Sequence, residues 1–237
     1  MKTAVLISGH ARTFQHTFAN QYWQVLRHFE DPHFFVSIVN DDDAATMELL
    51  KSRFFAGKVS IERVTQPDLP EPAGSPQFHA PAPIKGTVQG ILRQLWHLRR
   101  VYEFAGLGED FSCIVRLRPD LWFHRFTMPR FDLLNLQCIT PWWGSYGGIN
   151  DRFAIMGDEA AGAYFNTYRD LDTLIGRGCP LHPESLLAAQ LETNSVYITR
   201  SLNTEFSTLR RQEDGRCAFE WPHIETYDVV SYLRSTR

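Results

Sequence analysis

The sequence predicts an α/β fold: a single domain in which helices flank a mixed, mainly parallel sheet. Short, β-favouring apolar runs at 4–7, 34–39, 59–64 and 113–117 alternate with segments whose apolar residues follow helical spacing. The chain has 237 residues, 43% of them hydrophobic, which is enough for one substantial core. We therefore expect one domain over 1–237.

The composition excludes several classes of protein. A net charge of -3 and the lack of a basic stripe argue against a nucleic-acid partner. The four cysteines lie far apart and form no CxxC pair: Cys113, Cys138, Cys179 and Cys217. This spacing argues against a zinc ribbon and favours a reducing compartment. The apolar run from Thr3 to Ile7 is too short for a signal peptide or a membrane span. We expect a cytoplasmic protein without a transmembrane segment.

The first predicted strand leads into the turn Ser-Gly-His-Ala-Arg-Thr and then into a helix over 14–29, for which Thr13 is a suitable N-cap. A glycine turn before a helix N-terminus can bind an anion. Gly9 and His10 lie in this turn, and Arg12 could add a bidentate contact to phosphate. A plain turn with a solvated Arg12 explains the same residues, so the turn alone does not decide between an anion site and a plain turn.

The second strand ends in Asn-Asp-Asp-Asp. Asp41 could contact the ribose or base of a nucleotide, or the acids could simply begin a helix over 44–55, closed by Gly57. A third strand over 59–64 follows. The long irregular segment 66–86 contains six prolines and is either a functional lid or a surface excursion.

The next helix is expected to begin at its N-cap Thr87 and to end at Gly106. Its polar residues lie mostly off the apolar stripe, a pattern typical of a solvated face: Arg93, His97, Arg99 and Arg100.

The strand over 113–117 is expected to carry the best candidate site. With a side-chain period of two, Arg116, Arg118 and Asp120 point to the same side. Pro119 has no N–H for a neighbouring strand, so pairing should stop there. Two guanidiniums and a carboxylate therefore meet where a buried strand ends, which is where open α/β sheets bind ligands.

The second half of the chain predicts strands at 137–140, 153–156, 195–199 and 204–209, with a helix over 158–176. Between the first two strands, aromatic residues and glycines surround Asn-Asp-Arg, which suggests a shaped surface. Paired tryptophans most often serve as packing, but a sugar ring also stacks well on such a face.

Another helix is expected to begin at Pro183, a residue suited to the first helical position. Glu184 then lies in the first turn, where a carboxylate is favoured by the helix dipole. A helix start explains Glu184 fully, yet the carboxylate is also placed to face a ligand.

Four short motifs occur here in an order that resembles one family. They are Ser8–Arg12, Arg116–Asp120, Asn150–Phe153 and His182–Glu184, and the resemblance covers about residues 3–200. Together they resemble GT-A-class glycosyltransferase-like proteins of the surface-polysaccharide type.

The resemblance implies a GT-A-like (Rossmann-like) fold, with a nucleotide-binding half at about 1–125 and an acceptor-binding half at about 126–237. It implies transfer of a sugar from a nucleotide-diphosphate sugar to a hydroxyl of a glycan or related acceptor. The donor would contact Gly9, His10, Arg12, Asp41, Arg116, Arg118 and Asp120. For an inverting transfer, which needs a carboxylate base near the acceptor hydroxyl, the candidates are Asp151 and Glu184. A retaining transfer needs no separate base.

The family usually holds a divalent metal, Mn²⁺ or Mg²⁺, with an Asp-x-Asp motif. Here the matching triplet is Arg118-Pro119-Asp120, so a cation replaces the first acid. Asp120 could still hold a metal together with phosphate oxygens and water. Alternatively, Arg116 and Arg118 neutralise the diphosphate themselves, or Arg118 pairs with Asp120 to hold the end of the sheet.

Two other functions fit parts of the sequence. Nucleotidyl transfer on a related fold would need a glycine-rich, lysine-bearing loop after the first strand, which Ser-Gly-His-Ala-Arg lacks. A non-catalytic glycan- or nucleotide-binding module would explain the missing first acid, because a fold does not guarantee activity.

Overall fold

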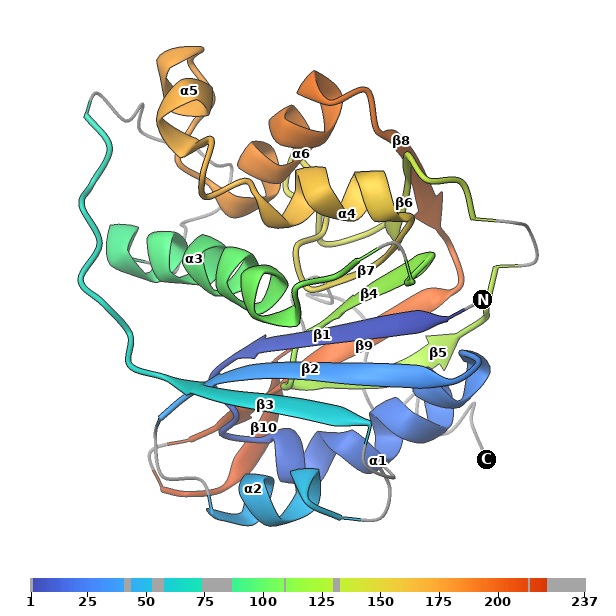
Figure 1. Ribbon diagram of the computed structural model, residues 1–237. Helices are drawn as coiled ribbons and strands as arrows, with labels where there is room; N and C mark the ends of the chain where they lie inside the picture. Colours follow the sequence, from blue (N-terminus) through green and yellow to red (C-terminus); the bar gives the residue numbers. More distant parts are fainter. Residues whose placement is uncertain are drawn as a thin grey trace, which may run out of the picture.

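The computed structural model describes residues 2–40, 44–52, 58–73, 87–108, 110–129, 133–212 and 214–220. Seven strands of this part form the large sheet (Figure 1): β1 (Thr3–Gly9), β2 (Pro32–Val39), β3 (Val59–Val64), β4 (Cys113–Leu117), β6 (Gln137–Pro141), β7 (Phe153–Met156) and β8 (Tyr197–Ser201). Their order is β3-β2-β1-β4-β7-β6-β8. Only β7 runs against its neighbours β4 and β6, while the other pairs are parallel. The predicted mixed, mainly parallel sheet is confirmed.

Helices cover both faces of the large sheet (Figure 1). One face carries α1 (Phe14–Gln24), the 3-10 turn η1 (Leu26–His28) and α2 (Ala44–Leu50), and the other carries α3 (Val88–Ala105), α4 (Asp158–Phe165), α5 (Leu171–Gly176) and α6 (Pro183–Thr193). Alternate residues of β1 enter the two cores: Val5 and Ile7 pack with α1, and Ala4 and Leu6 pack with α3 and α4. A strand buried on both faces needs a continuous apolar run, which is what the sequence contains.

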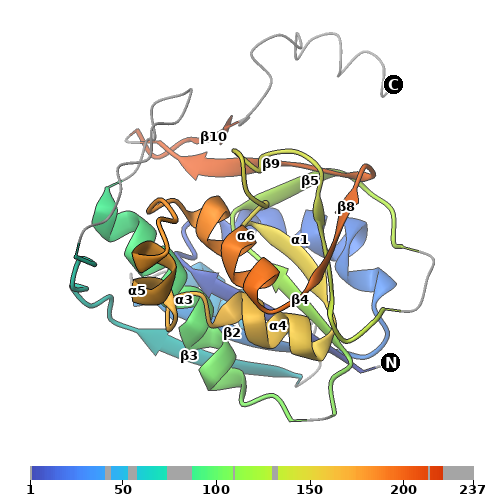
Figure 2. The ribbon, with the colours of Figure 1, turned by 90° about the horizontal axis from the view of Figure 1, so that it is seen from above.

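A second, antiparallel sheet lies beside the large one (Figure 2). Its strands are β5 (Leu121–Phe126), β9 (Thr204–Arg211) and β10 (Cys217–Glu220), in the order β10-β9-β5. Asn20 of α1 holds both backbone groups of Phe123, accepting from its N–H at 2.6 Å and donating to its carbonyl at 2.9 Å. The backbone N–H of Leu209 donates to the carbonyl of Asp120 at 2.7 Å. The small sheet therefore places β9 at the carboxyl end of β4.

Three predicted strands have the observed bounds: β3, β4 and β7. The strand expected over 195–199 lies at Tyr197–Ser201 instead. The small-sheet strands β5 and β10 have no counterpart among the predicted elements. β5 does show an inward alternation of Leu121 and Phe123, but a strand directly after a proline turn is easily read as part of that turn. β10 has only four residues, all of them exposed, and so short a run does not stand out from the surrounding sequence as a strand.

The first two predicted helices are too long. The helix expected over 14–29 ends at Gln24, because Val25 leaves the helical region with φ -123° and ψ -60°, and a 3-10 turn follows. The helix expected over 44–55 ends at Leu50. In the first case apolar residues continue with helical spacing after the backbone has changed course. Residues 53–55 of the second prediction lie outside the described residues.

The helix expected over 158–176 is two helices, α4 and α5. Asn166 Nδ2 donates to the carbonyl of Gly162 at 2.8 Å, and Thr167 Oγ1 donates to the carbonyl of Tyr164 at 2.8 Å. These side chains bind carbonyls near the end of α4, and such local bonds compete with helix continuation.

In the described part of the chain, no helix combines the length and apolar character that crossing a membrane requires.

Candidate active site

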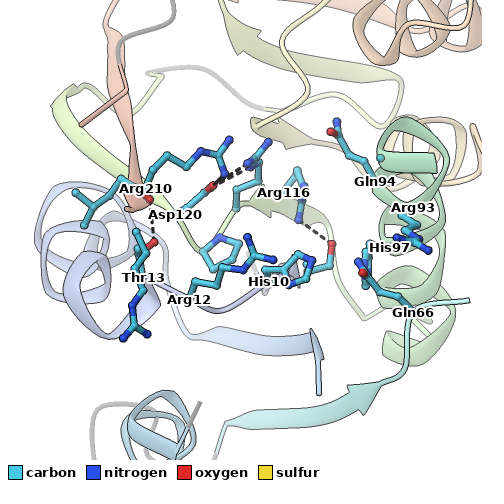
Figure 3. Close-up of a pocket in the computed structure, with 17 residues that line it drawn as sticks. His10, Arg12, Thr13, Gln66, Arg93, Gln94, His97, Arg116, Asp120 and Arg210 are labelled. Atoms are coloured by element: carbon cyan, nitrogen blue, oxygen red, sulfur yellow. Dashed lines mark hydrogen bonds and ion pairs between the residues drawn. The ribbon is translucent and has the colours of Figure 1, made fainter. Parts of the chain in front are cut away.

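A cavity of about 290 Å³ lies beyond the carboxyl ends of β1 and β4. Figure 3 shows side chains from the turn after β1, from α3, from the segment after β4 and from β9 arranged around it. Six arginines line it: Arg12, Arg93, Arg116, Arg118, Arg210 and Arg211. Among the described lining residues Asp120 is the one carboxylate. A concave site with this excess of positive charge concentrates anions.

The turn after β1 forms one edge of the cavity. Gly9 has φ +112°, in the region that side-chain-bearing residues rarely adopt, so this position favours glycine. Thr13 does occupy the N-cap position, but its side chain makes no capping bond. Its Oγ1 donates to the carbonyl of Leu209 at 3.1 Å and so ties the start of α1 to β9. The amides at the N-terminus of α1 are therefore not capped by Thr13.

Arg116 lies at the base of the cavity and is 2% exposed. Its Nη1 donates to Ser8 Oγ at 3.0 Å (Figure 3) and to the carbonyl of Leu117 at 3.2 Å. Its Nε has no hydrogen-bond partner among the described residues. Burial lowers the pKa of Arg116 to about 10, so the guanidinium is still charged at pH 7. It forms no ion pair with a described carboxylate, so this buried charge is one that a bound anion would compensate.

Asp120 is held between two arginines. Arg118 donates to both of its oxygens, with Nε 3.0 Å from Oδ1 and Nη2 2.7 Å from Oδ2, and Arg210 Nη1 donates to Oδ2 at 2.9 Å. Burial alone would raise the pKa of Asp120, but Arg118 and then Arg210 outweigh it, and the pKa is lowered. The pairing of Arg118 with Asp120 at the sheet end is thus the observed arrangement.

A divalent metal does not fit this arrangement. Both oxygens of Asp120 accept hydrogen bonds from guanidinium groups, whose charge would repel Mn²⁺ or Mg²⁺. In the ranges that the structure describes, no group of three His, Cys, Asp or Glu side chains is placed to hold a metal ion.

Residues of helix α3 form one wall of the cavity, a position that the sequence pattern did not indicate. The expectation of a solvated face is wrong for His97, which is 4% exposed and whose Nε2 lies 2.9 Å from Gln66 Nε2. Burial, followed by the charges of His10, Arg116 and Arg93, lowers the pKa of His97 to about 4. The imidazole is therefore neutral at pH 7. Arg93 is positioned by Asp68, with Nη2 2.7 Å from Oδ1.

Two buried carboxyl groups that the sequence singled out do not line the cavity. Asp151 is 4% exposed and Glu184 is 5% exposed. Gln94 lines the cavity and also donates through Nε2 to Asp151 Oδ2, so Asp151 lies directly behind this part of the wall. Burial, then the charge of Asp151, raises the pKa of Glu184 to about 8.

The loop before β7 and the start of α6 are fixed against each other. Pro183 stands at the first position of α6 and Glu184 in its first turn, as predicted. The N–H of Ile149 donates to the carbonyl of Glu184 at 3.1 Å. At Gly148 a Cβ would lie 2.0 Å from that carbonyl oxygen, so this position requires glycine. The two acids are thereby brought together from segments more than thirty residues apart in the sequence.

The structure places most of the predicted donor-site residues around one cavity: Gly9, His10, Arg12, Arg116, Arg118 and Asp120. Asp41 lies outside the described residues. The sequence reasoning missed six other lining residues: Gln66, Arg93, Gln94, His97, Arg210 and Arg211. The adjacent pair Arg210-Arg211 is a sequence signal that could have indicated an anion site. However, nothing in the neighbouring sequence indicates that β9 ends beside β4.

The chain matches no family model, and no curated protein matches its sequence. Similar solved structures include the galactosyltransferase LgtC in complex with donor and acceptor sugar analogs, at 10% identity and a TM-score of 0.48, covering 85% of this chain and 73% of that one. An active-site mutant of LgtC gives the same identity and TM-score, with 85% and 72% covered. Values this low assign neither a family nor an activity.

Proposed function

We propose that the protein is a glycosyltransferase with a GT-A-like fold, which moves a sugar from a nucleotide-diphosphate sugar to a hydroxyl of a glycan or related acceptor. One observation carries the proposal: a cavity lined by six described arginines is bounded by Gln94, whose amide donates to the buried carboxyl group of Asp151. Such a site can hold a diphosphate leaving group and, beside it, accept a proton.

In this proposal the arginines supply the positive charge that a metal ion supplies in many phosphate sites. Arg116 is buried and charged, and without a paired carboxylate among the described residues. Arg118 and Arg210 are held in place by Asp120. Fixed positive groups stabilise negative charge as it develops on the departing diphosphate. The nucleotide would lie in the half formed by about 1–125, and Asp41 stays a proposed ribose or base contact.

The acceptor would bind in the half formed by about 126–237. Asp151 and Glu184 are the candidate bases for the acceptor hydroxyl, and a base must lie within hydrogen-bond reach of the proton it removes. The proposal keeps the cytoplasmic location expected from the sequence.

A non-catalytic binding module is the second candidate. It is favoured by the contacts of Asp120, whose oxygens accept hydrogen bonds from Arg118 and Arg210 and are therefore not available to a metal ion. Such a module would bind a nucleotide or glycan without consuming it.

Turnover separates the two candidates. A thermal-shift panel of UDP, GDP, CMP and their sugars, each with Mn²⁺ and with EDTA, identifies the donor, because a ligand that binds only the folded state raises the melting temperature. Nucleotide release from that donor is then measured with a mixture of glycan acceptors. The transferase proposal predicts acceptor-dependent release, whereas binding without release supports the module.

A matched pair of variants locates the donor. Arg116→Met should abolish the shift, while Arg177→Ala, at the exposed end of α5, should keep it. No shift with any nucleotide would contradict the transferase proposal.

A further inference from the structure

The six described arginines around the cavity differ in how their charge is compensated. Arg93 on α3 is paired with the segment that follows β3, because its Nη2 donates to Asp68 Oδ1 at 2.7 Å. Arg118 and Arg210 share the single carboxylate of Asp120. Two acids therefore serve three of the arginines.

The other three arginines have no carboxylate partner in the described part of the chain: Arg12, Arg116 and Arg211. Arg116 is buried at the base of the cavity, whereas Arg12 and Arg211 are exposed, so a ligand can reach them from solvent. Of the six positive charges that line the cavity, the two acids Asp68 and Asp120 offset two, and four remain uncompensated.

The two exposed arginines belong to the same side of the cavity. Thr13 Oγ1 donates to the carbonyl of Leu209 at 3.1 Å, which joins the start of α1 to β9. Arg12 immediately precedes Thr13, and Arg211 is the last residue of β9. Figure 3 shows Arg93 on the opposite wall, on α3. The uncompensated charge therefore extends from the base of the cavity to the side formed by α1 and β9.

A nucleotide-diphosphate sugar would compensate only part of this charge. A phosphate monoester carries about two negative charges at pH 7, because its second pKa is about 6. Both phosphates of a nucleotide-diphosphate sugar are bridged on two sides and lack that second proton, so the diphosphate carries about two charges in all. Like charges that lie side by side repel each other, and an anion bound between them removes this cost. About half of the uncompensated charge is left for another anionic group.

We propose that the cavity binds a further anionic group beside the diphosphate: a carboxylate or phosphate carried by the transferred sugar or by the acceptor. This inference rests on the proposed function, in which the diphosphate occupies the base at Arg116 and Arg118. Arg12 and Arg211 bind the further group, and the guanidinium fork can hold either a carboxylate or a phosphate in bidentate fashion. The substrates are thus acidic: a sugar acid in the donor, or a phosphorylated or carboxylated glycan as the acceptor.

Inorganic anions test the further position without a nucleotide. Calorimetry in EDTA at fixed ionic strength first measures pyrophosphate binding, and inorganic phosphate is then titrated into the pyrophosphate-saturated protein. We expect phosphate to bind without displacing pyrophosphate. Arg211→Met should weaken phosphate binding at least tenfold more than pyrophosphate binding, because it removes a charge-assisted contact to the further group alone.

The control is Arg177→Ala, at the exposed end of α5, which should keep both affinities. Phosphate that does not bind, that binds only by displacing pyrophosphate, or that loses no more affinity than pyrophosphate in Arg211→Met would overturn the inference and leave the diphosphate site standing. A protein that binds neither anion would refute the diphosphate site and this inference with it.

Nucleotide sugars that differ by one carboxylate show which substrate carries the further group. UDP-glucuronate is compared with UDP-glucose, and GDP-mannuronate with GDP-mannose. If the transferred sugar carries the group, the sugar acid binds at least tenfold more tightly than its neutral partner and prevents phosphate from binding. If the acceptor carries it, both members of a pair bind alike and phosphate still binds beside them. Equal affinities together with no phosphate binding would overturn the inference.

Discussion

Replacing Asp120 by Asn should destabilise the protein strongly. The Asp120 side chain is 11% exposed and that of Arg118 is 17% exposed, and three hydrogen bonds of 2.7 to 3.0 Å join the carboxylate to its two guanidinium partners. Removing one member of a buried ion pair leaves an uncompensated charge and costs about 3–5 kcal/mol. Because the Arg210 side chain is 47% exposed, most of this cost comes from Arg118.

Thermal unfolding followed by circular dichroism measures the effect. One kcal/mol shifts the melting temperature of a chain of this size by about 2–4 °C, so Asp120→Asn should lower it by roughly 6–20 °C. The control is Glu103→Gln, which breaks an exposed ion pair with Arg99 one turn away on α3. Such pairs contribute about 0.3–0.5 kcal/mol. An unchanged or raised melting temperature in Asp120→Asn would refute the reasoning, since it would mean that Asp120 does not compensate Arg118.

Three further changes have defined outcomes. Because the pKa of Glu184 is raised to about 8 in the folded protein, its contribution to stability is complete below its unfolded value of about 4.3 and is lost as the pH rises through 8. The unfolding free energy of the wild type relative to Glu184→Gln should therefore fall between pH 5 and pH 8 in urea titrations. Arg116→Met should lower the affinity for inorganic pyrophosphate at least tenfold by calorimetry, since charge-assisted bonds contribute about 1.5–3 kcal/mol. Gly148→Ala, whose Cβ would overlap the Glu184 carbonyl, should cost at least about 1–3 kcal/mol, whereas Gly108→Ala, which meets open space, should unfold near the wild type.

The central part of the site can be predicted from one short stretch of sequence. The strand at 113–117 was predicted with its observed bounds, and period-two alternation correctly placed Arg116, Arg118 and Asp120 around one hollow. The glycine turn before α1 was also placed correctly beside them. In each case the information is local, because the pleat of a strand and the turn after it follow from adjacent residues.

The rest of the site depends on contacts between distant segments. Arg210 reaches Asp120 only because β9 pairs with β5, and the sequence of β5 follows too closely on a proline turn to stand out. His97 lies off the apolar stripe of α3 and is buried by the segment that contains Gln66. Neither contact leaves a periodic pattern in the sequence.

The central claim is that arginines, and not a metal, hold the diphosphate of a nucleotide sugar. Titration calorimetry of UDP and GDP into the protein in EDTA tests this most directly, with Arg116→Met alongside. The account predicts that at least one of the two binds the wild type in EDTA and that Arg116→Met loses this binding. Binding that appears only after Mn²⁺ is added, or that survives in Arg116→Met, would contradict it.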